Sequence, residues 1–285
     1  MKYHLHKNGW TPIIDIDLKS ATRNDVIAIS ELVAKHTVVV IKKQQLSIED
    51  ELKFVKLFDH PESLFEPGHY DYIHCVVPGT DGLIYRVGGN LNEYGVPGIG
   101  EHVAETGWHH DHPWRSKVRP KLISLHAIKG TEGSTTSFIN NVLSYNELDD
   151  ATKELLQPLE AILLRNTSLD SSLFNTEIDG WQCPTGDIVE DYSVPVVYTN
   201  SLGVTGGFFP YLQIHAFKGM SREDSKKILK MLAEHITQEK YCYHHNWEDG
   251  DMVISDQWHG LHKRQHCETI STRLLHRAMY DYTFV

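Results

Sequence analysis

The segment 108–114, with the sequence WHHDHPW, carries residue types that bind metal ions. Side chains two positions apart in an extended strand point to the same face. His109 and Asp111 can therefore offer an imidazole nitrogen and a carboxylate oxygen to one metal ion. A histidine from a distant part of the chain would complete a set of two histidines and one carboxylate. That set leaves coordination positions open and suits ferrous iron in oxygen chemistry.

A second histidine-rich cluster begins far along the chain and offers candidates for the third ligand. His259, His262 and His266 all lie in it, and His262 follows Asp111 by 151 residues (262 − 111). A chain with 19 histidines also produces short His-x-Asp matches by chance, and histidines that bind no specific metal are the competing interpretation. The residues around the second cluster must therefore show whether these histidines form a metal site.

Those surroundings resemble a known family. The segment 250–256 (GDMVISD) ends six residues before His262, Arg273 follows His262 by eleven residues, and Arg277 follows by four more. With the Trp-His-x-Asp element at 108–111, these intervals resemble the taurine dioxygenase (TauD/TfdA-like) family of Fe(II)/2-oxoglutarate-dependent oxygenases. The match is poorest between about residues 63 and 107 and between about residues 167 and 195.

The resemblance assigns roles to the candidate residues. It implies that His109, Asp111 and His262 are the catalytic metal ligands for Fe(II), and the family spacing favours His262 over His259. It also implies that Arg273 binds the C5-carboxylate of the cosubstrate 2-oxoglutarate. A planar, permanently charged guanidinium suits this role because it can hold a carboxylate through two hydrogen bonds.

Two further positions follow from the same resemblance. A threonine after a glycine-rich turn adds a hydroxyl group to the cosubstrate site, and in the segment TEGSTT at 131–136 this is Thr135, or Thr136 if the register differs by one. Arg277 lies four residues past Arg273, on the same strand face by parity, and is expected to bind an acidic group of the substrate. A surface or salt-bridge arginine is the competing interpretation of Arg277.

Two stretches are predicted to be lid-like insertions, near residues 63–107 and 167–193. Long loops beside active sites often close over the substrate. Tyr85, Arg86 and Asn90 in the first stretch are the side chains best suited to contact a polar ligand there. Trp114, beside the metal-binding segment, is a further candidate for substrate contact, although packing that orients the ligands is the preferred interpretation of its position.

The composition is that of a globular enzyme, with 40% hydrophobic and 23% charged residues in 285. We expect one domain over 1–285, because ligands from 109 to 262 must converge. The net charge of −11 argues against a nucleic-acid surface, and no apolar run approaches the ~18–20 residues of a membrane span. The N-terminus lacks a signal peptide and the four cysteines form no Cys-x-x-Cys pair, which favours a cytoplasmic protein with reduced thiols. Association into homo-oligomers is left open.

Hydrophobic periodicity predicts an α+β protein. Helices are expected over 22–36, 47–58, 145–157 and 221–236, and strands over 36–42, 120–128, 159–165, 241–245, 252–255 and 273–282. Short strands with flanking helices, and ligands on distant strands, suit a double-stranded β-helix (jelly-roll, cupin-like) core.

The resemblance implies a dioxygenase that uses Fe(II), 2-oxoglutarate and O2 and releases succinate and CO2. We expect it to hydroxylate an unactivated C–H bond of a small acidic or zwitterionic molecule, such as an amino acid, a sulfonate or a natural-product intermediate. Desaturation or cyclisation could occur at the same iron site. Two hypotheses compete with this one: a cupin-type metalloenzyme without oxidative chemistry, and a jelly-roll binding module without catalysis.

Overall fold

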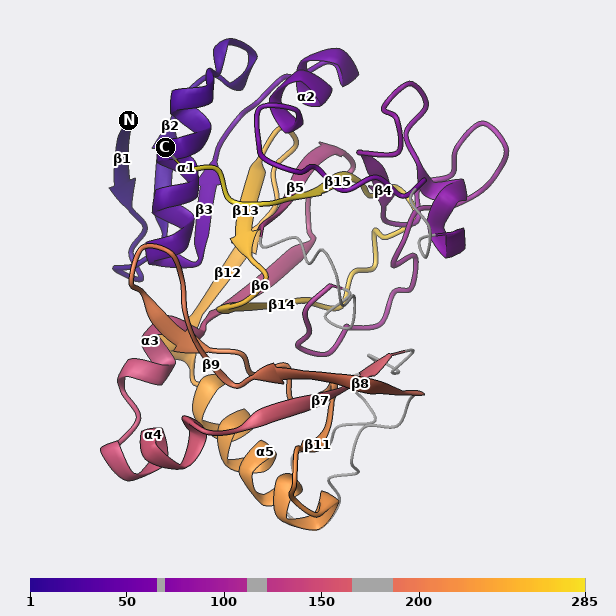
Figure 1. The fold of residues 1–285 in the computed structure, drawn as a ribbon. Coiled ribbons are helices and arrows are strands. Elements are labelled where there is room, and N and C mark those ends of the chain that lie inside the picture. Colours follow the sequence, from indigo (N-terminus) through magenta and orange to yellow (C-terminus); the bar gives the residue numbers. More distant parts are fainter. Residues whose placement is uncertain (66–69, 112–121, 166–186, 285) are drawn as a thin grey trace.

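Two sheets packed face to face form the centre of the computed structural model, which describes residues 1–65, 70–111, 122–165 and 187–284 (Figure 1). The larger sheet contains, in spatial order, β1 (Lys2–Leu5), β2 (Pro12–Asp15), β3 (Val38–Ile41), β13 (Met252–Asp256), β5 (Leu122–Lys129), β15 (Leu274–Tyr280) and β4 (Tyr85–Val87). The smaller sheet contains β12 (Cys242–Asn246), β6 (Thr135–Asn140) and β14 (Gly260–Arg264). Neighbouring strands are antiparallel except β2 and β3. Strands distant in the sequence are thus neighbours, as expected for the double-stranded β-helix that the sequence predicts.

The central strands β3 and β13 of the larger sheet are buried on both faces, which explains the continuous apolar run of each. Val38 and Val40 of β3 point toward the smaller sheet, where they pack with Phe138 of β6. Val39 and Ile41 point the other way, into a second cluster. Successive side chains of a strand alternate between its two faces. The four β-branched residues of β3 therefore contribute two side chains to each of the two apolar clusters.

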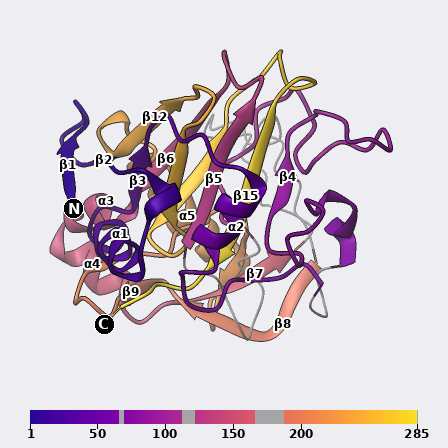
Figure 2. The same ribbon diagram turned by 90° about the horizontal axis from the view of Figure 1, so that it is seen from above.

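Two helices cover the outer face of the larger sheet. They are α1 (Arg23–His36) and α2 (Ile48–Val55), which lie on the same side of the sheet (Figure 2). Their apolar side chains pack on the outward side chains of β3, β13 and β15. α1 begins at a capping box in which the Thr22 N–H donates to the Asp25 carboxylate at 2.9 Å. α2 begins at an equivalent box formed by Ser47 and Asp50. The helices expected from 22 and 47 therefore begin one residue later, at Arg23 and Ile48, with Thr22 and Ser47 as their N-caps.

A third layer covers the outer face of the smaller sheet. It consists of a sheet in the order β11 (Ile214–Phe217), β7 (Glu160–Arg165) and β8 (Asp187–Pro195), together with α5 (Arg222–Ile236). Ile139 of β6 and Leu261 of β14 pack into its apolar cluster with Leu163 and Leu232. The short ribbon of β9 (Val197–Thr199) and β10 (Thr205–Gly207) lies beside this layer. The smaller sheet is thus held between the larger sheet and this third layer.

The helix expected over 145–157 is wrong in its extent. The structure instead has α3 (Asn141–Asn146) and α4 (Asp150–Leu156), each with its own cap. The Asn140 side chain accepts from Val142 and Leu143, and the Asp149 side chain accepts from Thr152. The two N-caps, nine residues apart, each begin a separate short helix. Hydrophobic periodicity alone does not reveal this division. Short 3-10 helices lie at Leu18–Ser20, Tyr70–Cys75 and Glu239–Tyr241.

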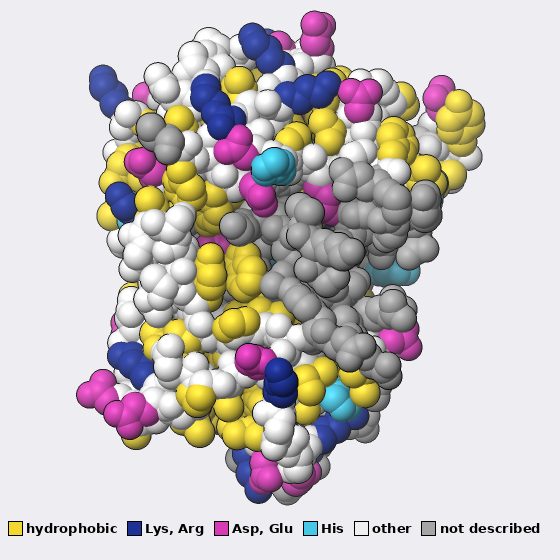
Figure 3. All heavy atoms as spheres, viewed as in Figure 1, with side chains coloured by type: hydrophobic (Ala, Val, Ile, Leu, Met, Phe, Trp, Pro, Cys, Tyr) yellow, Lys and Arg dark blue, Asp and Glu magenta, His cyan; other side chains and the backbone are white. Residues whose placement is uncertain are grey.

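The described surface agrees with the composition. On the face shown in Figure 3, basic and acidic side chains are interspersed over the described residues. In the same part of the chain, no helix has the length and apolar character needed to cross a membrane.

Candidate metal centre

Two histidines far apart in the sequence are placed opposite each other by backbone pairing. The His109 N–H donates to the His262 carbonyl at 3.0 Å, and the His262 N–H donates to the His109 carbonyl at 3.1 Å. A further bond from the Thr106 N–H to the Arg264 carbonyl, at 2.9 Å, extends this pairing along β14. Directly opposed residues of an antiparallel pair have adjacent side chains, and the two imidazole centroids are 4.4 Å apart.

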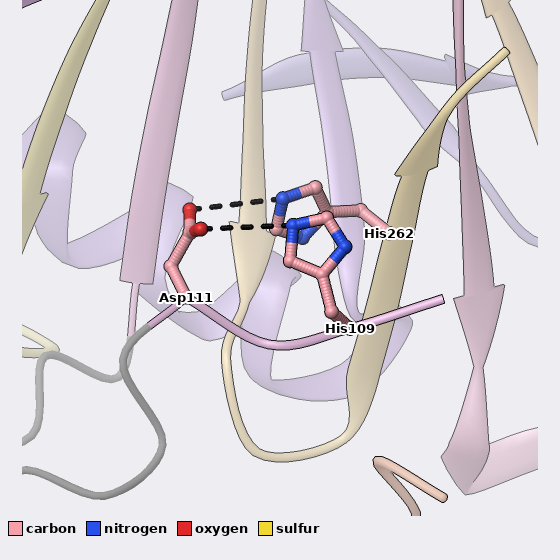
Figure 4. A group of neighbouring side chains, drawn as sticks. All are labelled: His109, Asp111 and His262. Carbon is pink, nitrogen blue, oxygen red and sulfur yellow. Dashed lines mark ion pairs between the residues drawn. The ribbon is translucent and has the colours of Figure 1, made fainter. Parts of the chain in front are cut away.

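The Asp111 carboxylate faces both imidazole rings (Figure 4). Its Oδ1 lies 3.8 Å from Nε2 of His109, and its Oδ2 lies 3.6 Å from Nε2 of His262. Within the described ranges, these three residues are the one group of histidine, cysteine or acidic side chains whose ligand atoms converge, all within 4.8 Å of one another. A first-row metal ion about 2.1 Å from each ligand holds neighbouring donors roughly 3 Å apart, so the three ligand atoms must move closer together when an ion binds.

The protonation of the two histidines favours metal binding. His109 Nδ1 lies 2.7 Å from the Gly107 carbonyl oxygen, which can only accept, so Nδ1 carries the proton and Nε2 presents its lone pair to the site. Burial lowers the pKa of His109, and it lowers the pKa of His262 to about 3. Neutral imidazoles are the form that binds a metal ion, so both side chains are ready as ligands at neutral pH.

The Asp111 carboxylate is also bound by a buried arginine. Arg277 of β15 donates from Nη1 to Asp111 Oδ2 at 2.8 Å, and its guanidinium carbon lies 4.4 Å from the centre of the Tyr85 ring. The Tyr85 hydroxyl donates to Met279 Sδ at 2.6 Å, which fixes the ring beneath the guanidinium. The structure therefore brings Arg277 and Tyr85, both predicted as substrate residues, beside the metal-binding group.

Arg273 is a buried cation, and the described residues provide hydrogen-bond acceptors for only some of its guanidinium N–H groups. Its side chain is among the largest fully buried ones, its Nε donates to Ser134 Oγ at 3.2 Å, and its Nη1 has no hydrogen-bond partner in the described structure. Burial lowers the pKa of Arg273 to about 10, and the nearby Arg264 guanidinium contributes in the same direction. A buried guanidinium with an unused N–H group fits a carboxylate ligand, because such a charge is otherwise costly to desolvate.

Thr135 and Thr136 lie on opposite faces of β6. The Thr135 hydroxyl donates to Asn246 Oδ1 at 2.8 Å on the outer face of β6, which also carries Ile139. Thr136 points to the opposite face, where it is buried and its hydroxyl accepts from Trp247 Nε1 at 2.9 Å. Phe138 shares that inner face, and its ring lies 6.2 Å from that of His262. Thr136, the alternative that the sequence left open, therefore shares the inner face with Phe138, because a shift of one residue moves a strand side chain to the other face.

Arg86 and Asn90 have structural contacts instead of facing the metal-binding group. Arg86 lies on the other face of β4 from Tyr85, and its guanidinium donates to the carbonyl oxygens of Val96, at 2.9 Å, and of Asn90. The Asn90 N–H donates to the Arg273 carbonyl at 3.3 Å. The segment around 88–99 is thus tied to the backbone before β15.

Gly88 shows how closely this segment approaches β15. A Cβ atom at Gly88 would lie 2.3 Å from the Arg273 carbonyl oxygen, so only glycine permits the approach. Trp114 lies outside the described residues. So does most of the second predicted lid near 167–193, of which the structure describes 187–193, at the start of β8.

The two histidines that compete with His262 as third ligand lie elsewhere. His259 is buried with its Nε2 3.1 Å from the Tyr198 carbonyl oxygen and its Nδ1 3.5 Å from Asp256. His266 is exposed. Neither takes part in the converging group, so the geometry selects His262.

Sequence reasoning missed two glutamines at the site. Gln213 and Gln257 bind the backbone of the His-x-Asp segment through their side-chain amides. A single glutamine belongs to no recognisable motif, so the sequence offered no reason to predict a role for either residue.

Comparisons with known proteins agree with this geometry. A sequence model described as "Taurine catabolism dioxygenase TauD, TfdA family" matches residues 4–279. The chain is 23% identical to an alpha-ketoglutarate-dependent 2,4-dichlorophenoxyacetate dioxygenase from Cupriavidus pinatubonensis, over 96% of this chain and 95% of the relative. It is 24% identical to an alpha-ketoglutarate-dependent sulfate ester dioxygenase from Pseudomonas putida, over 84% and 74%.

A solved structure confirms the fold class. The crystal structure of AAD-2 in complex with Mn(II) and N-oxalylglycine superposes with a TM-score of 0.78 at 20% identity, covering 99% of both chains. The sequence match, which spans almost the whole length, confirms the resemblance deduced from the motif intervals. The chain belongs to the taurine catabolism dioxygenase TauD, TfdA family.

Proposed function

We propose that this protein oxidises a small organic acid or zwitterion at an unactivated C–H bond, with Fe(II) held by His109, Asp111 and His262. As a member of its family it is a 2-oxoglutarate-dependent dioxygenase, and its cofactors are Fe(II), 2-oxoglutarate and O2. The observation that carries the proposal is the convergence of two neutral imidazoles and one carboxylate from distant segments. Ferrous iron at such a site supplies the oxygen chemistry that amino-acid side chains lack, with succinate and CO2 as coproducts.

Arg273 is proposed to bind the far carboxylate of 2-oxoglutarate. The support is its deep burial, its unused Nη1 and the neighbouring Arg264, which together make this place attractive for an anion. Hydroxyl groups suited to assist lie at Ser134, which already contacts Arg273, and at Thr136 on the inner face of β6. We assign to Thr136 the cosubstrate role expected of Thr135. Burial at this place excludes water and strengthens the charge-assisted hydrogen bonds.

Arg277 is proposed to favour an acidic group on the substrate. Its guanidinium lies directly beside the Asp111 carboxylate, with the Tyr85 ring on one face, so it places a positive charge at the edge of the metal-binding group. The names of two relatives support an anionic substrate, since one acts on 2,4-dichlorophenoxyacetate and the other on a sulfate ester. A carboxylate, sulfonate or sulfate group near Arg277 would orient the remainder of the substrate toward the metal.

The remaining expectations concern partners and location. A small molecule as substrate, without nucleic acid or membrane, is supported by the net charge of −11 and by the interspersed surface charges. The three cysteines that the structure describes are free thiols, which supports a cytoplasmic location. A single domain over 1–285 is supported by the ligands from 109 to 262 converging on one site.

The test is 2-oxoglutarate-dependent succinate formation by protein loaded anaerobically with Fe(II). A panel of carboxylates, sulfonates, sulfate esters and amino acids is offered with O2, and product analysis distinguishes hydroxylation from desaturation or ring closure. His109→Ala and His262→Ala should abolish turnover. For an accepted substrate, a neutral ester or amide analogue should bind worse by ~2–5 kcal/mol, typical of a broken buried ion pair. Anaerobic turnover without 2-oxoglutarate would instead indicate a cupin-type metalloenzyme.

A further inference from the structure

Gln213 makes two hydrogen bonds to the residue that separates the two metal-binding side chains of the His-x-Asp segment. The His110 N–H donates to Gln213 Oε1 at 2.8 Å, and Gln213 Nε2 donates to the His110 carbonyl at 2.9 Å. The side-chain amide thus pairs with the peptide groups of His110 as a neighbouring strand would. Both residues are almost fully buried, with relative exposures of 1% each, so water does not compete for these bonds.

The backbone of His110 determines where two ligands point. His109 precedes it and Asp111 follows it, so a rotation of either His110 peptide group would move one ligand relative to the other. The Asp111 N–H is fixed as well, because it donates to Gln257 Oε1 at 3.0 Å. The ring of His110 packs 4.8 Å from that of Phe208, on the same segment of the chain as Gln213. Backbone and side chain of His110 are therefore both held from the 208–213 segment.

Gln213 is itself rigidly placed. Its N–H donates to the Pro210 carbonyl at 2.7 Å, and its carbonyl accepts from the Leu164 N–H of β7 at 2.8 Å. Gln213 thus connects the third layer of the fold to the metal-binding segment, 103 residues earlier in the chain. A ligand pair held in advance of metal binding loses less conformational entropy when the ion binds.

We propose that Gln213 is a positioning residue of the metal centre, which holds His109 and Asp111 in the arrangement that binds the ion. The inference rests on the proposed metal ligands, and it adds a residue whose side chain binds the backbone between two of them. Residues that orient metal ligands typically change metal affinity by about 10- to 100-fold when they are replaced. Gln213→Met keeps the length and volume of the side chain and removes both hydrogen bonds. It should raise the Kd for Mn(II) about tenfold or more.

Gln44 offers a matched control. It is also buried, its Oε1 accepts from the Leu18 N–H at 2.9 Å, and its Nε2 donates to the carbonyls of Ile16 at 3.0 Å and Lys42 at 2.8 Å. Gln44→Met therefore removes the same type of buried amide–backbone contact outside the metal-binding segment. Both variants should lose stability against urea, and only Gln213→Met should bind Mn(II) more weakly.

The experiment measures the Kd of Mn(II) by calorimetry, and the free energy of unfolding without metal, for the full-length wild type and both variants. Mn(II) serves as the probe because it does not consume O2. Equal Kd values for Gln213→Met and the wild type, or equal weakening in both variants, would overturn the positioning role. Absence of Mn(II) binding by the wild type would contradict the proposed metal ligands instead, so the two failures are distinguishable.

Discussion

Arg273 combines deep burial with an unused N–H group, and this combination predicts the effect of its removal. The charge-assisted bidentate contact proposed for its guanidinium is worth on the order of 1.5–3 kcal/mol or more. Arg273→Ala should therefore weaken 2-oxoglutarate binding to the Mn(II)-loaded protein by roughly tenfold to hundredfold, as measured by calorimetry without any substrate. Arg273→Lys should also be impaired, because an ammonium group cannot reproduce the planar fork. Unchanged affinity for 2-oxoglutarate in both variants would show that Arg273 does not bind the cosubstrate.

Thr135 and Thr136 form a matched pair on opposite faces of β6. Thr136→Val should raise the Kd for 2-oxoglutarate, because it removes the inward hydroxyl near the cosubstrate site, and it should lower stability by ~1–3 kcal/mol by leaving the buried Trp247 Nε1 without its acceptor. Thr135→Val, on the outer face, should leave the Kd unchanged. The same calorimetric titration compares the two variants. A larger effect at Thr135 would return the cosubstrate role to that residue.

This pair also shows what the sequence can predict at single-residue resolution. His109 and Asp111 follow from strand parity, and His262 follows from the intervals that the family shares. The choice between Thr135 and Thr136 depends on where β6 begins, which a one-residue shift reverses. Gln213 contacts the site through one amide from a distant segment, so only the folded structure reveals it.

At the level of elements, the long amphipathic helices and the apolar strands could be predicted, whereas the short polar strands could not. β6 and β14 carry the inner face of the site, yet they include Thr, Ser, Asn, His, Lys and Arg and show no apolar run. Their pairing is determined by contacts distant in the sequence, such as His262 opposite Phe138. Strand preference depends strongly on such tertiary context, which a single sequence does not contain.

α2 is fixed to the larger sheet by a buried charged contact. Glu51 Oε2 accepts from His276 Nδ1 at 2.6 Å, and its Oε1 lies 3.3 Å from His126 Nδ1. Burial alone would raise the pKa of Glu51, but the hydrogen bonds of the two histidines outweigh it and hold the pKa at about 2, below the ordinary 4.5. A carboxyl with a depressed pKa stabilises the fold above its unfolded-state value, and this contribution is lost as the pH falls from about 4.5 toward 2.

Glu51→Gln should therefore change how stability depends on pH. At neutral pH the variant should be less stable than the wild type, and between about pH 5 and pH 3 the difference should shrink by at most about 1.4 kcal/mol per pH unit. Urea unfolding followed by tryptophan fluorescence at several pH values measures it. Glu49→Gln, on an exposed position of the same helix, is the control and should follow the wild type. Parallel pH profiles for Glu51→Gln and the wild type would refute the stabilising contact.

At the scale of the whole molecule, the candidate site joins segments from three layers of the fold. The 106–111 segment pairs with β14 of the smaller sheet, while Arg277 of the larger sheet binds Asp111 and Gln213 of the third layer binds His110. Three layers therefore meet at one carboxylate and two imidazoles. A metal ion bound there would crosslink all of them, so metal binding and global stability should be linked.

Metal addition should accordingly stabilise the protein, and the two candidate histidines should differ in this effect. At a Mn(II) concentration about one hundred times its Kd, the native state gains about 2.7 kcal/mol, which calorimetric or fluorescence melting detects as a higher Tm. His262→Ala should lose this shift. His259→Ala should be less stable without metal, because His259 is buried against Tyr198 and Asp256, yet it should retain the shift. The reverse pattern, with the shift lost in His259→Ala and kept in His262→Ala, would transfer the third ligand to His259 while leaving the family assignment intact.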